Sequence, residues 1–180
     1  MGDFLQNSWL ALLLTAAAAY LLGSIGDYVF LDNNRNGIQD EGDTFVADSP
    51  VTLHIKKVTV DGTTESTKTT ATDAEGKYLF EDLPCNYLKA GAPQGSTDPK
   101  DDIGETYYTY RVEFTNPDTG YTVTERYKGE DRTIDSNIDE NYFSEEITLK
   151  VTLDALGVLH GEDNDTIDAG FITASALGNR

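Results

Sequence analysis

After residue 25, the sequence alternates between short runs rich in Thr, Val, Tyr, Ile and Phe and breaks rich in Gly, Asp, Asn and Pro. Within the runs, apolar and polar residues alternate: in YRVEF (110–114), the first, third and fifth residues share one face. This pattern predicts half-buried strands, and no convincing helix interrupts them. The predicted fold class is therefore all-β, an antiparallel β-sandwich. The predicted strands are Asp27–Leu31, Val51–Val60, Thr64–Thr72, Lys77–Phe80, Tyr107–Thr115, Tyr121–Arg126, Ser144–Leu153 and Thr166–Ile172.

The N-terminus has a different character. Residues 4–25 carry no charge, and their centre reads WLALLLTAAAAYLL. As a helix, this stretch would be about 33 Å long, enough for a hydrocarbon layer of about 30 Å. Trp9 and Tyr20 would lie near the two membrane interfaces. The sequence therefore predicts an N-terminal transmembrane helix in residues 1–25, contacting the bilayer through residues 4–25, and a β-sandwich over residues 26–180.

Three alternatives to a membrane helix remain open. A cleaved secretory signal would use Ala16–Ala19 as its cleavage region, but the leading MGDFLQN carries Asp3 and no basic residue. The run could also be a core helix of the domain or the assembly helix of a pilin-like filament. Because the first basic residue is Arg35, charge asymmetry does not set the orientation of a membrane helix.

The charge balance restricts the partners. The chain has 13 Lys and Arg against 32 Asp and Glu, a formal net charge of −19. Such a chain repels the phosphates of nucleic acids and of anionic lipids, and it favours hard cations, calcium above all. The single cysteine, Cys85, excludes an internal disulfide. His54 and His160 have no nucleophile motif beside them, so we predict that the chain is not an enzyme.

The run DNNRNGIQDEGD (32–43) has the spacing of a calcium-binding loop. Oxygen-bearing side chains stand at positions 1, 3 and 5, a glycine stands at position 6, and a backbone carbonyl is expected to serve at position 7. A strand pattern precedes the loop and no amphipathic helix follows it, which indicates a calcium loop on a β-scaffold rather than a helix–loop–helix. The predicted ligands are Asp32, Asn34, Asn36, the Ile38 carbonyl, Asp40 and Asp43.

Two later acidic clusters are candidates for the same or another metal site. The first is DRTIDSNIDE, which contains Asp135 and Asn137, and the second is EDNDTIDAGF, which contains Asp168. Their carboxylates would repel one another unless a cation lay between them, although solvated turns on an acidic surface are the simpler explanation for each. Residues 85–106 form a long Gly-, Pro- and Asp-rich insertion, which is predicted to be a contact loop.

These motifs occur in a familiar order. IGDYVFLDNNRNGIQDEGD, VTLHI, TDAEGKYLFEDL, TGYTVT, IDSN and TIDAGF follow one another over residues 25–173. The series resembles the B-repeat domains of staphylococcal serine–aspartate repeat surface proteins (SdrD B-like). The resemblance implies a calcium-stabilised sandwich of the collagen-adhesin B type, related to immunoglobulin-like and prealbumin-like sandwiches and displayed outside the cytoplasm. It also implies that Asp135 and Asn137 belong to a second calcium site and that Asp168 serves either site.

The leading functional hypothesis is a non-catalytic structural subunit. In it, the helix anchors a single-pass protein and the calcium-stabilised sandwich docks on the extracytoplasmic face of a larger membrane complex, whether photosynthetic, respiratory or secretory. The C-terminal domain is expected in the periplasm or at the cell surface. The alternative hypothesis is a cell-surface adhesin or a filament subunit, in which a homopolymer is possible.

Overall fold

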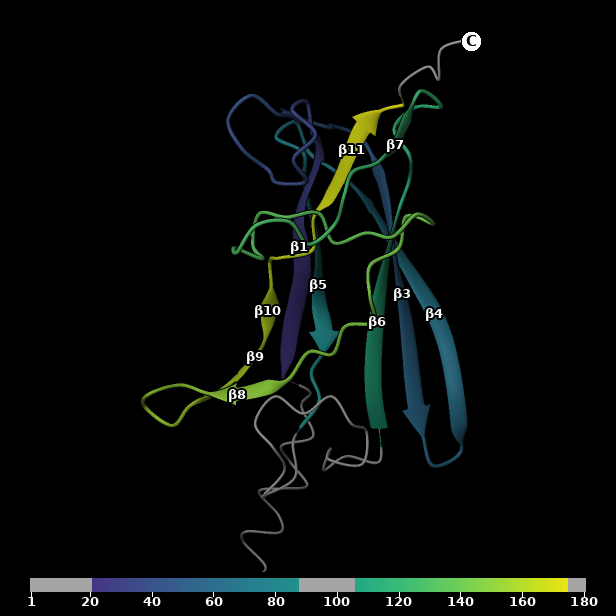
Figure 1. The fold of residues 1–180 in the computed structure, drawn as a ribbon. Coiled ribbons are helices and arrows are strands. Elements are labelled where there is room, and N and C mark those ends of the chain that lie inside the picture. Colours follow the sequence, from purple (N-terminus) through teal and green to yellow (C-terminus); the bar gives the residue numbers. More distant parts are fainter. Residues whose placement is uncertain (1–20, 88–105, 175–180) are drawn as a thin grey trace, which may run out of the picture.

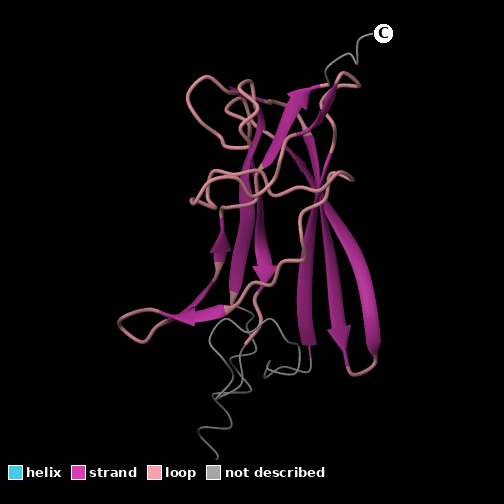
Figure 2. Ribbon diagram, viewed as in Figure 1, coloured by secondary structure: helices cyan, strands magenta, loops and turns pink. Residues whose placement is uncertain are grey.

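The computed structural model describes residues 21–87 and 106–174, and these consist of strands, turns and loops (Figures 1 and 2). No helix is found among them, so the prediction of an all-β domain is confirmed. The strands form two main sheets and one small hairpin. Their bounds are Leu22–Leu31 (β1), Thr44–Phe45 (β2), Pro50–Thr59 (β3), Gly62–Ala71 (β4), Lys77–Pro84 (β5), Thr106–Phe114 (β6), Tyr121–Val123 (β7), Val151–Leu153 (β8), Leu159–Gly161 (β9), Asp163–Asn164 (β10) and Ala169–Thr173 (β11).

The first sheet is built around β1. On one side β1 pairs antiparallel with β5 and β2, and on the other side it pairs parallel with β10 and β11. Strand β7 then extends the sheet from β11. The prediction of a purely antiparallel sandwich is therefore wrong in one respect. Strand β1 runs in the same direction as β10 and β11, beside which it lies.

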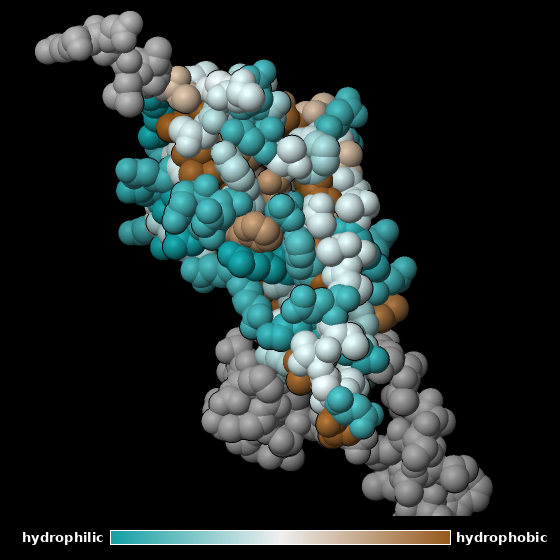
Figure 3. Space-filling view, turned by 90° about the vertical axis from the view of Figure 1, so that its right-hand side faces the viewer, coloured by the Kyte–Doolittle hydropathy of each residue, from teal (hydrophilic) through white to brown (hydrophobic). Residues whose placement is uncertain are grey.

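The second sheet contains β4, β3 and β6 in that order. The β3–β4 hairpin pairs without interruption from Pro50↔Ala71 to Thr59↔Gly62. Strand β4 is exposed along almost its whole length, which agrees with its Thr- and Ser-rich sequence GTTESTKTTA. Figure 3 faces this side of the molecule, which is largely hydrophilic or intermediate in hydropathy.

The hydrophobic core lies between the two sheets. Alternate residues of β3 and β6 point inward, as the sequence pattern predicts: Val51, Leu53, Val112 and Phe114 are all buried. They pack against inward residues of β1, β5 and β11, including Phe171. Cys85 is buried at the edge of this core and is a free thiol.

A segment without continuous pairing connects the two sheets. Residues 142–151 follow the edge of β6, where Ile147 and Tyr110 exchange two backbone hydrogen bonds, and then reach Asn86 after β5. The single strand predicted over Ser144–Leu153 is therefore wrong: only Val151–Leu153 is a strand. Apolar and polar residues do alternate in ITLKVTL (147–153). However, Ile147 pairs with Tyr110 of β6, whereas Leu149 and Val151 hydrogen-bond to Asn86, which follows β5.

The N-terminal prediction needs a correction where it meets the fold. Residues 22–25 belong to β1, where Leu22 and Gly23 pair with Pro84 and Leu83 of β5, so the helix predicted over 4–25 is wrong at its C-terminal end. The rest of that helix, and residues 88–105 of the predicted contact loop, lie outside the described residues. Over residues 21–87 and 106–174, no helix has the length and apolar character that crossing a bilayer requires.

One buried hydroxyl ties the first sheet to the segment before its last strand. The Tyr78 hydroxyl donates a hydrogen bond of 2.6 Å to the Ile167 carbonyl, and Tyr78 is buried. We expect Tyr78→Phe to lower the free energy of unfolding by about 1 kcal/mol because the carbonyl loses its donor without regaining water. Urea denaturation followed by circular dichroism measures this change, and an unchanged midpoint would show that water replaces the hydroxyl.

Candidate metal centre

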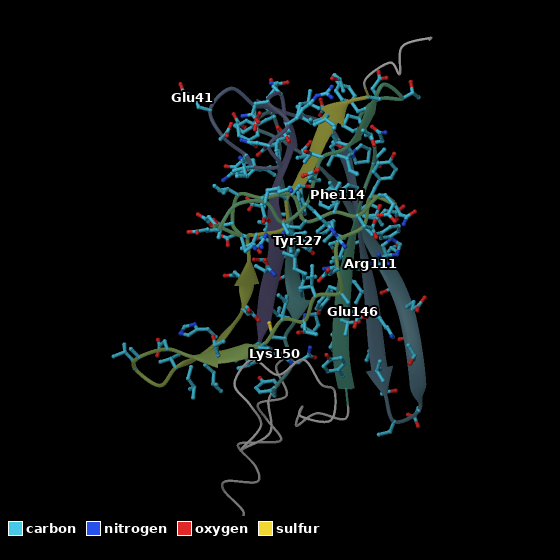
Figure 4. All side chains as sticks on the ribbon, in the orientation of Figure 1. Glu41, Arg111, Phe114, Tyr127, Glu146 and Lys150 are labelled. Carbon is cyan, nitrogen blue, oxygen red and sulfur yellow. The ribbon has the colours of Figure 1, made fainter. Side chains whose placement is uncertain are left out.

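The loop predicted to bind calcium leaves the end of β1 and returns through β2. Its two ends are held together because Leu31 pairs with Thr44 and Phe30 pairs with Phe45. Figure 4 shows Glu41 on the outer bend of this loop. The sequence between the two strands is thus closed into one compact turn, as a metal-binding loop requires.

Asp32, at the first position, organises the loop from inside. Its side chain is buried, and its Oδ1 accepts hydrogen bonds from the backbone N–H groups of Arg35 and Asn36. Its Oδ2 accepts the N–H of Gly37 at 2.8 Å and the hydroxyl of Thr124. The chain therefore wraps around a buried carboxylate whose two oxygens accept hydrogen bonds from the protein; that Asp32 is a calcium ligand stays a prediction.

Gly37, at the sixth position, meets two steric demands. Its φ is +77°, a left-handed conformation that side chains disfavour. A Cβ at this position would also lie 2.3 Å from the Glu125 carbonyl oxygen. A residue with a side chain would have to displace the backbone of the neighbouring 121–138 region.

Three of the predicted ligands meet inside the loop. The Nδ2 groups of Asn34 and Asn36 donate to the two oxygens of Asp40, at 2.9 and 2.7 Å. Asp43 is turned elsewhere, since its carboxylate accepts the backbone N–H groups of Asn33 and Asp40. The Oδ1 atoms of Asn34 and Asn36 accept the backbone N–H groups of Asn36 and Ile38. These oxygens and the Asp40 carboxylate are of the kind that hard cations bind.

The Ile38 carbonyl is placed beside a second predicted site. Ile38 and Asp135 form an isolated antiparallel bridge. Its two hydrogen bonds are made by the neighbouring residues: the Gln39 N–H donates to the Ile134 carbonyl, and the Ser136 N–H donates to the Gly37 carbonyl. The bridge therefore leaves the Ile38 carbonyl itself unengaged by Asp135. It also places the 32–43 loop directly against the IDSN segment.

The structure brings together the three later candidates. Asp135 and Asp168 are fully buried; the Nδ2 of Asn137 donates to Asp135, and the Oδ1 of Asn137 accepts the N–H of Asp168 at 2.7 Å. Arg132 neutralises Asp135 through an ion pair. The two acidic segments that are far apart in the sequence thus form one cluster, at the start of β11.

One carboxylate oxygen of Asp168 differs from the other in its hydrogen bonding within residues 21–87 and 106–174. Its Oδ1 accepts the backbone N–H of Tyr28 at 3.0 Å, whereas its buried Oδ2 has no hydrogen-bond partner among the described residues. Burial, followed by the charge of Asp27, raises the pKa of Asp168 from 3.8 to about 8. A buried carboxylate oxygen without a donor is the feature that a bound cation would explain.

Asp27 is a member of this cluster that the sequence analysis missed. It is half-buried, and burial together with the charge of Asp165 raises its pKa from 3.8 to about 7, with Lys77 acting in the opposite direction. In the sequence, Asp27 is the first residue of the predicted strand Asp27–Leu31. One signal in the sequence could have pointed to Asp27: it is the only charged residue in the run LGSIGDYVFL (22–31), whose other residues are apolar, small or aromatic.

The side chains are not arranged as a finished coordination sphere. Over residues 21–87 and 106–174, no three His, Cys, Asp or Glu side chains stand close enough together to hold a metal ion. The 32–43 loop instead combines carboxylate, carboxamide and carbonyl oxygens. The two histidines stand apart from it: His54 pairs with Glu113 at 2.7 Å and His160 with Asp154 at 3.1 Å.

Comparison with known proteins assigns the fold to a family. The family model of the SdrD B-like domain matches residues 23–171, which include both sheets and both acidic clusters. The chain belongs to the SdrD B-like domain family. It is 36% identical over 148 residues to serine-aspartate repeat-containing protein D of Staphylococcus aureus (strain Newman), covering 82% of this chain and 8% of that protein. It is 34% identical to serine-aspartate repeat-containing protein F of Staphylococcus epidermidis, covering 82% of this chain and 6% of that protein.

The match confirms the family resemblance seen in the motifs. It begins at Gly23, one residue after β1 begins. The chain spans less than a tenth of the length of these relatives. An SdrD B-like domain is thus one part of a much longer polypeptide in those proteins.

Proposed function

We propose that this chain is a non-catalytic structural module of a cell-surface, adhesin-type protein and that calcium stabilises it. The observation that carries the proposal is the family match, which covers almost the entire sandwich. This is the alternative given by the sequence, and the comparisons support it better than a subunit docked on a membrane complex. Display outside the cytoplasm agrees with the surface proteins that the motifs resemble.

The path of the chain supports a role as a spacer. Strands β1 and β11 run parallel and side by side, so the chain enters the sandwich at Leu21 and leaves it at the opposite end, after Thr173 (Figure 1). A module with its ends at opposite poles adds its full length to a polypeptide that continues on both sides. Such a module separates its neighbours, and its rigidity determines how well it does so.

We assign the stabilising calcium to the connected clusters described above. The 32–43 loop would hold one ion through Asn34, Asn36, Asp40 and the Ile38 carbonyl, with Asp32 and Asp43 shaping the loop or completing the site. The buried cluster of Asp135, Asn137 and Asp168, with Asp27 nearby, would hold a second. Calcium supplies positive charge to a chain whose formal net charge is −19, and it links β1 to β11 and to the 121–138 region.

The surface location has a direct test. We expect an antibody raised against residues 21–174 to label intact cells of the source organism and to lose its target after brief protease treatment of those cells. Permeabilisation should add little further signal, because the module lies outside the membrane. A cytoplasmic protein probed in parallel controls for lysis, and labelling that requires permeabilisation would refute the surface assignment.

A further inference from the structure

The hairpin formed by β8 and β9 stands apart from the sandwich. The two strands form a separate two-stranded sheet, and Figure 1 shows it projecting from the end of the molecule where β1 begins. Its turn is well made: Asp154 accepts the backbone N–H groups of Leu156 and Val158, and Gly157 takes a φ of +76°. An isolated hairpin of this size is only marginally stable in water, so a surface packed on its exposed part would add to the support that the hairpin receives at its root.

The hairpin displays apolar side chains that nothing in the described structure covers. Leu153 and Leu159 are directly opposite each other and therefore share a face, and they are 66% and 48% exposed. Leu156 at the tip is 88% exposed, and Val158 beside it is 50% exposed. Scattered apolar residues on a surface are ordinary, but several exposed apolar side chains on one short hairpin make that hairpin a candidate interaction site.

The root of the hairpin touches the point at which the chain enters the sandwich. A Cβ on Gly161 would lie 2.1 Å from the Leu22 carbonyl oxygen, so the two backbones are in direct contact. The Glu162 carbonyl accepts the N–H of Ser24, and Glu162 in turn bonds the backbone of Lys150 at both N–H and carbonyl. Figure 4 shows Lys150 at this root. Leu22, at the start of β1, is itself 46% exposed.

The sequence that arrives at this point is apolar and uncharged. Residues 9–20 read WLALLLTAAAAY, and they join the sandwich at Leu21, whose carbonyl accepts the N–H of Cys85. We propose that residues 9–20 pack on the β8–β9 hairpin and cover Leu153, Leu156, Val158 and Leu159. This goes beyond the proposed role as a surface module, because it describes an intramolecular contact that stabilises the sandwich where β1 begins.

Charge favours residues 9–20 over two other possible partners of the hairpin, a lipid bilayer and a second copy of the chain. Asp154 lies in the turn of the hairpin, and Glu162 and Asp163 directly follow β9, so an anionic bilayer would be repelled from this part of the molecule. A second copy would bring another 19 negative charges to the same place. Residues 9–20 carry no charge, and they are tethered beside the hairpin, which makes their effective concentration high.

Trp9 makes the proposal measurable, because it is the only tryptophan of the chain. In the full-length protein we expect Trp9 to be shielded from acrylamide. The triple variant Leu153→Ser/Leu156→Ser/Leu159→Ser should raise its quenching constant about twofold or more, because the apolar cover is lost. Val60→Ser is the matched control, since Val60 is 78% exposed at the tip of the β3–β4 hairpin and should leave Trp9 unchanged. Near-ultraviolet circular dichroism verifies that the sandwich stays folded.

Each remaining outcome overturns the proposal. Equal quenching in the full-length protein and the triple variant would mean that the hairpin does not cover residues 9–20. Shielding that disappears on dilution, together with a dimer mass by light scattering, would assign the hairpin to a second copy. Flotation of the full-length protein with phosphatidylcholine vesicles, lost in the triple variant, would assign it to a lipid surface.

Discussion

Removing calcium is expected to lower the melting temperature of the folded module by roughly 5–10 °C. An ion that binds only the folded state at a hundredfold excess over its Kd adds about 2.7 kcal/mol to the free energy of unfolding, and each kcal/mol shifts the midpoint of a domain this size by about 2–4 °C. Differential scanning calorimetry in millimolar calcium and in excess chelator measures the shift. A melt that is indifferent to chelator would remove calcium from the proposed function while leaving the surface assignment intact.

A matched pair of variants locates the effect. Asp40→Asn removes the carboxylate on which Asn34 and Asn36 converge, and it should abolish most of the shift caused by calcium. Glu41→Gln removes the same charge from the next residue, which is exposed on the outer bend of the loop, and it should leave the shift nearly unchanged. Equal losses in both variants would mean that the loop acts through its overall charge rather than as a set of ligands.

The tight turn of the 32–43 loop could be predicted from the sequence because its geometry is local, whereas calcium binding by that loop stays a prediction. The spacing of Asp32, Gly37 and Asp40 places these residues within one turn whatever surrounds them, and the structure has Asp32 holding the N–H of Gly37. The strands β3 and β6 were predictable for a related reason, because alternation along one strand reports which face is buried.

The parts that escaped prediction depend on partners far away in the chain. The alternation in Ser144–Leu153 indicates faces but not neighbours, so it gave no warning that the segment passes from β6 to Asn86. The parallel pairing of β1 with β11 is equally invisible locally, and that pairing is what brings the backbone of Tyr28 to Asp168, about 140 residues later. Asp27 enters the candidate site only through this pairing.

The same non-local pairing makes Asp168 the most informative residue to change. Without calcium, Asp168 is a buried carboxylate whose Oδ2 meets no donor in the part of the chain that the structure describes, so its charged form destabilises the fold. We expect Asp168→Asn to raise the free energy of unfolding in chelator at pH 8.5 by an amount on the order of 1–3 kcal/mol. The carboxamide keeps an oxygen for the Tyr28 N–H and carries no charge. In calcium, the same variant should gain less from the ion than the unmodified protein does.

The pH dependence in chelator has a defined sign. The pKa values of Asp27 and Asp168 rise in the folded state to about 7 and about 8, from 3.8. Between about pH 4 and pH 8, the folded protein therefore binds protons that the unfolded chain has released, and the contribution of these groups to stability falls as the pH rises. Urea titrations at about pH 5, 6.5 and 8 should show that decline, and Asp168→Asn should flatten it.

Asp61→Asn provides the control for net charge, because Asp61 is exposed at the β3–β4 turn. It should leave both the pH slope and the response to calcium as they are in the unmodified protein. If Asp168→Asn instead destabilises the module in chelator and leaves the calcium shift whole, Asp168 serves the fold through its bond to Tyr28 and the second ion lies elsewhere. If Asp168→Asn behaves as predicted, the buried Asp168 carboxylate between β1 and β11 destabilises the fold without calcium and stabilises it when calcium is bound. The stability of the module then depends on the calcium concentration around it.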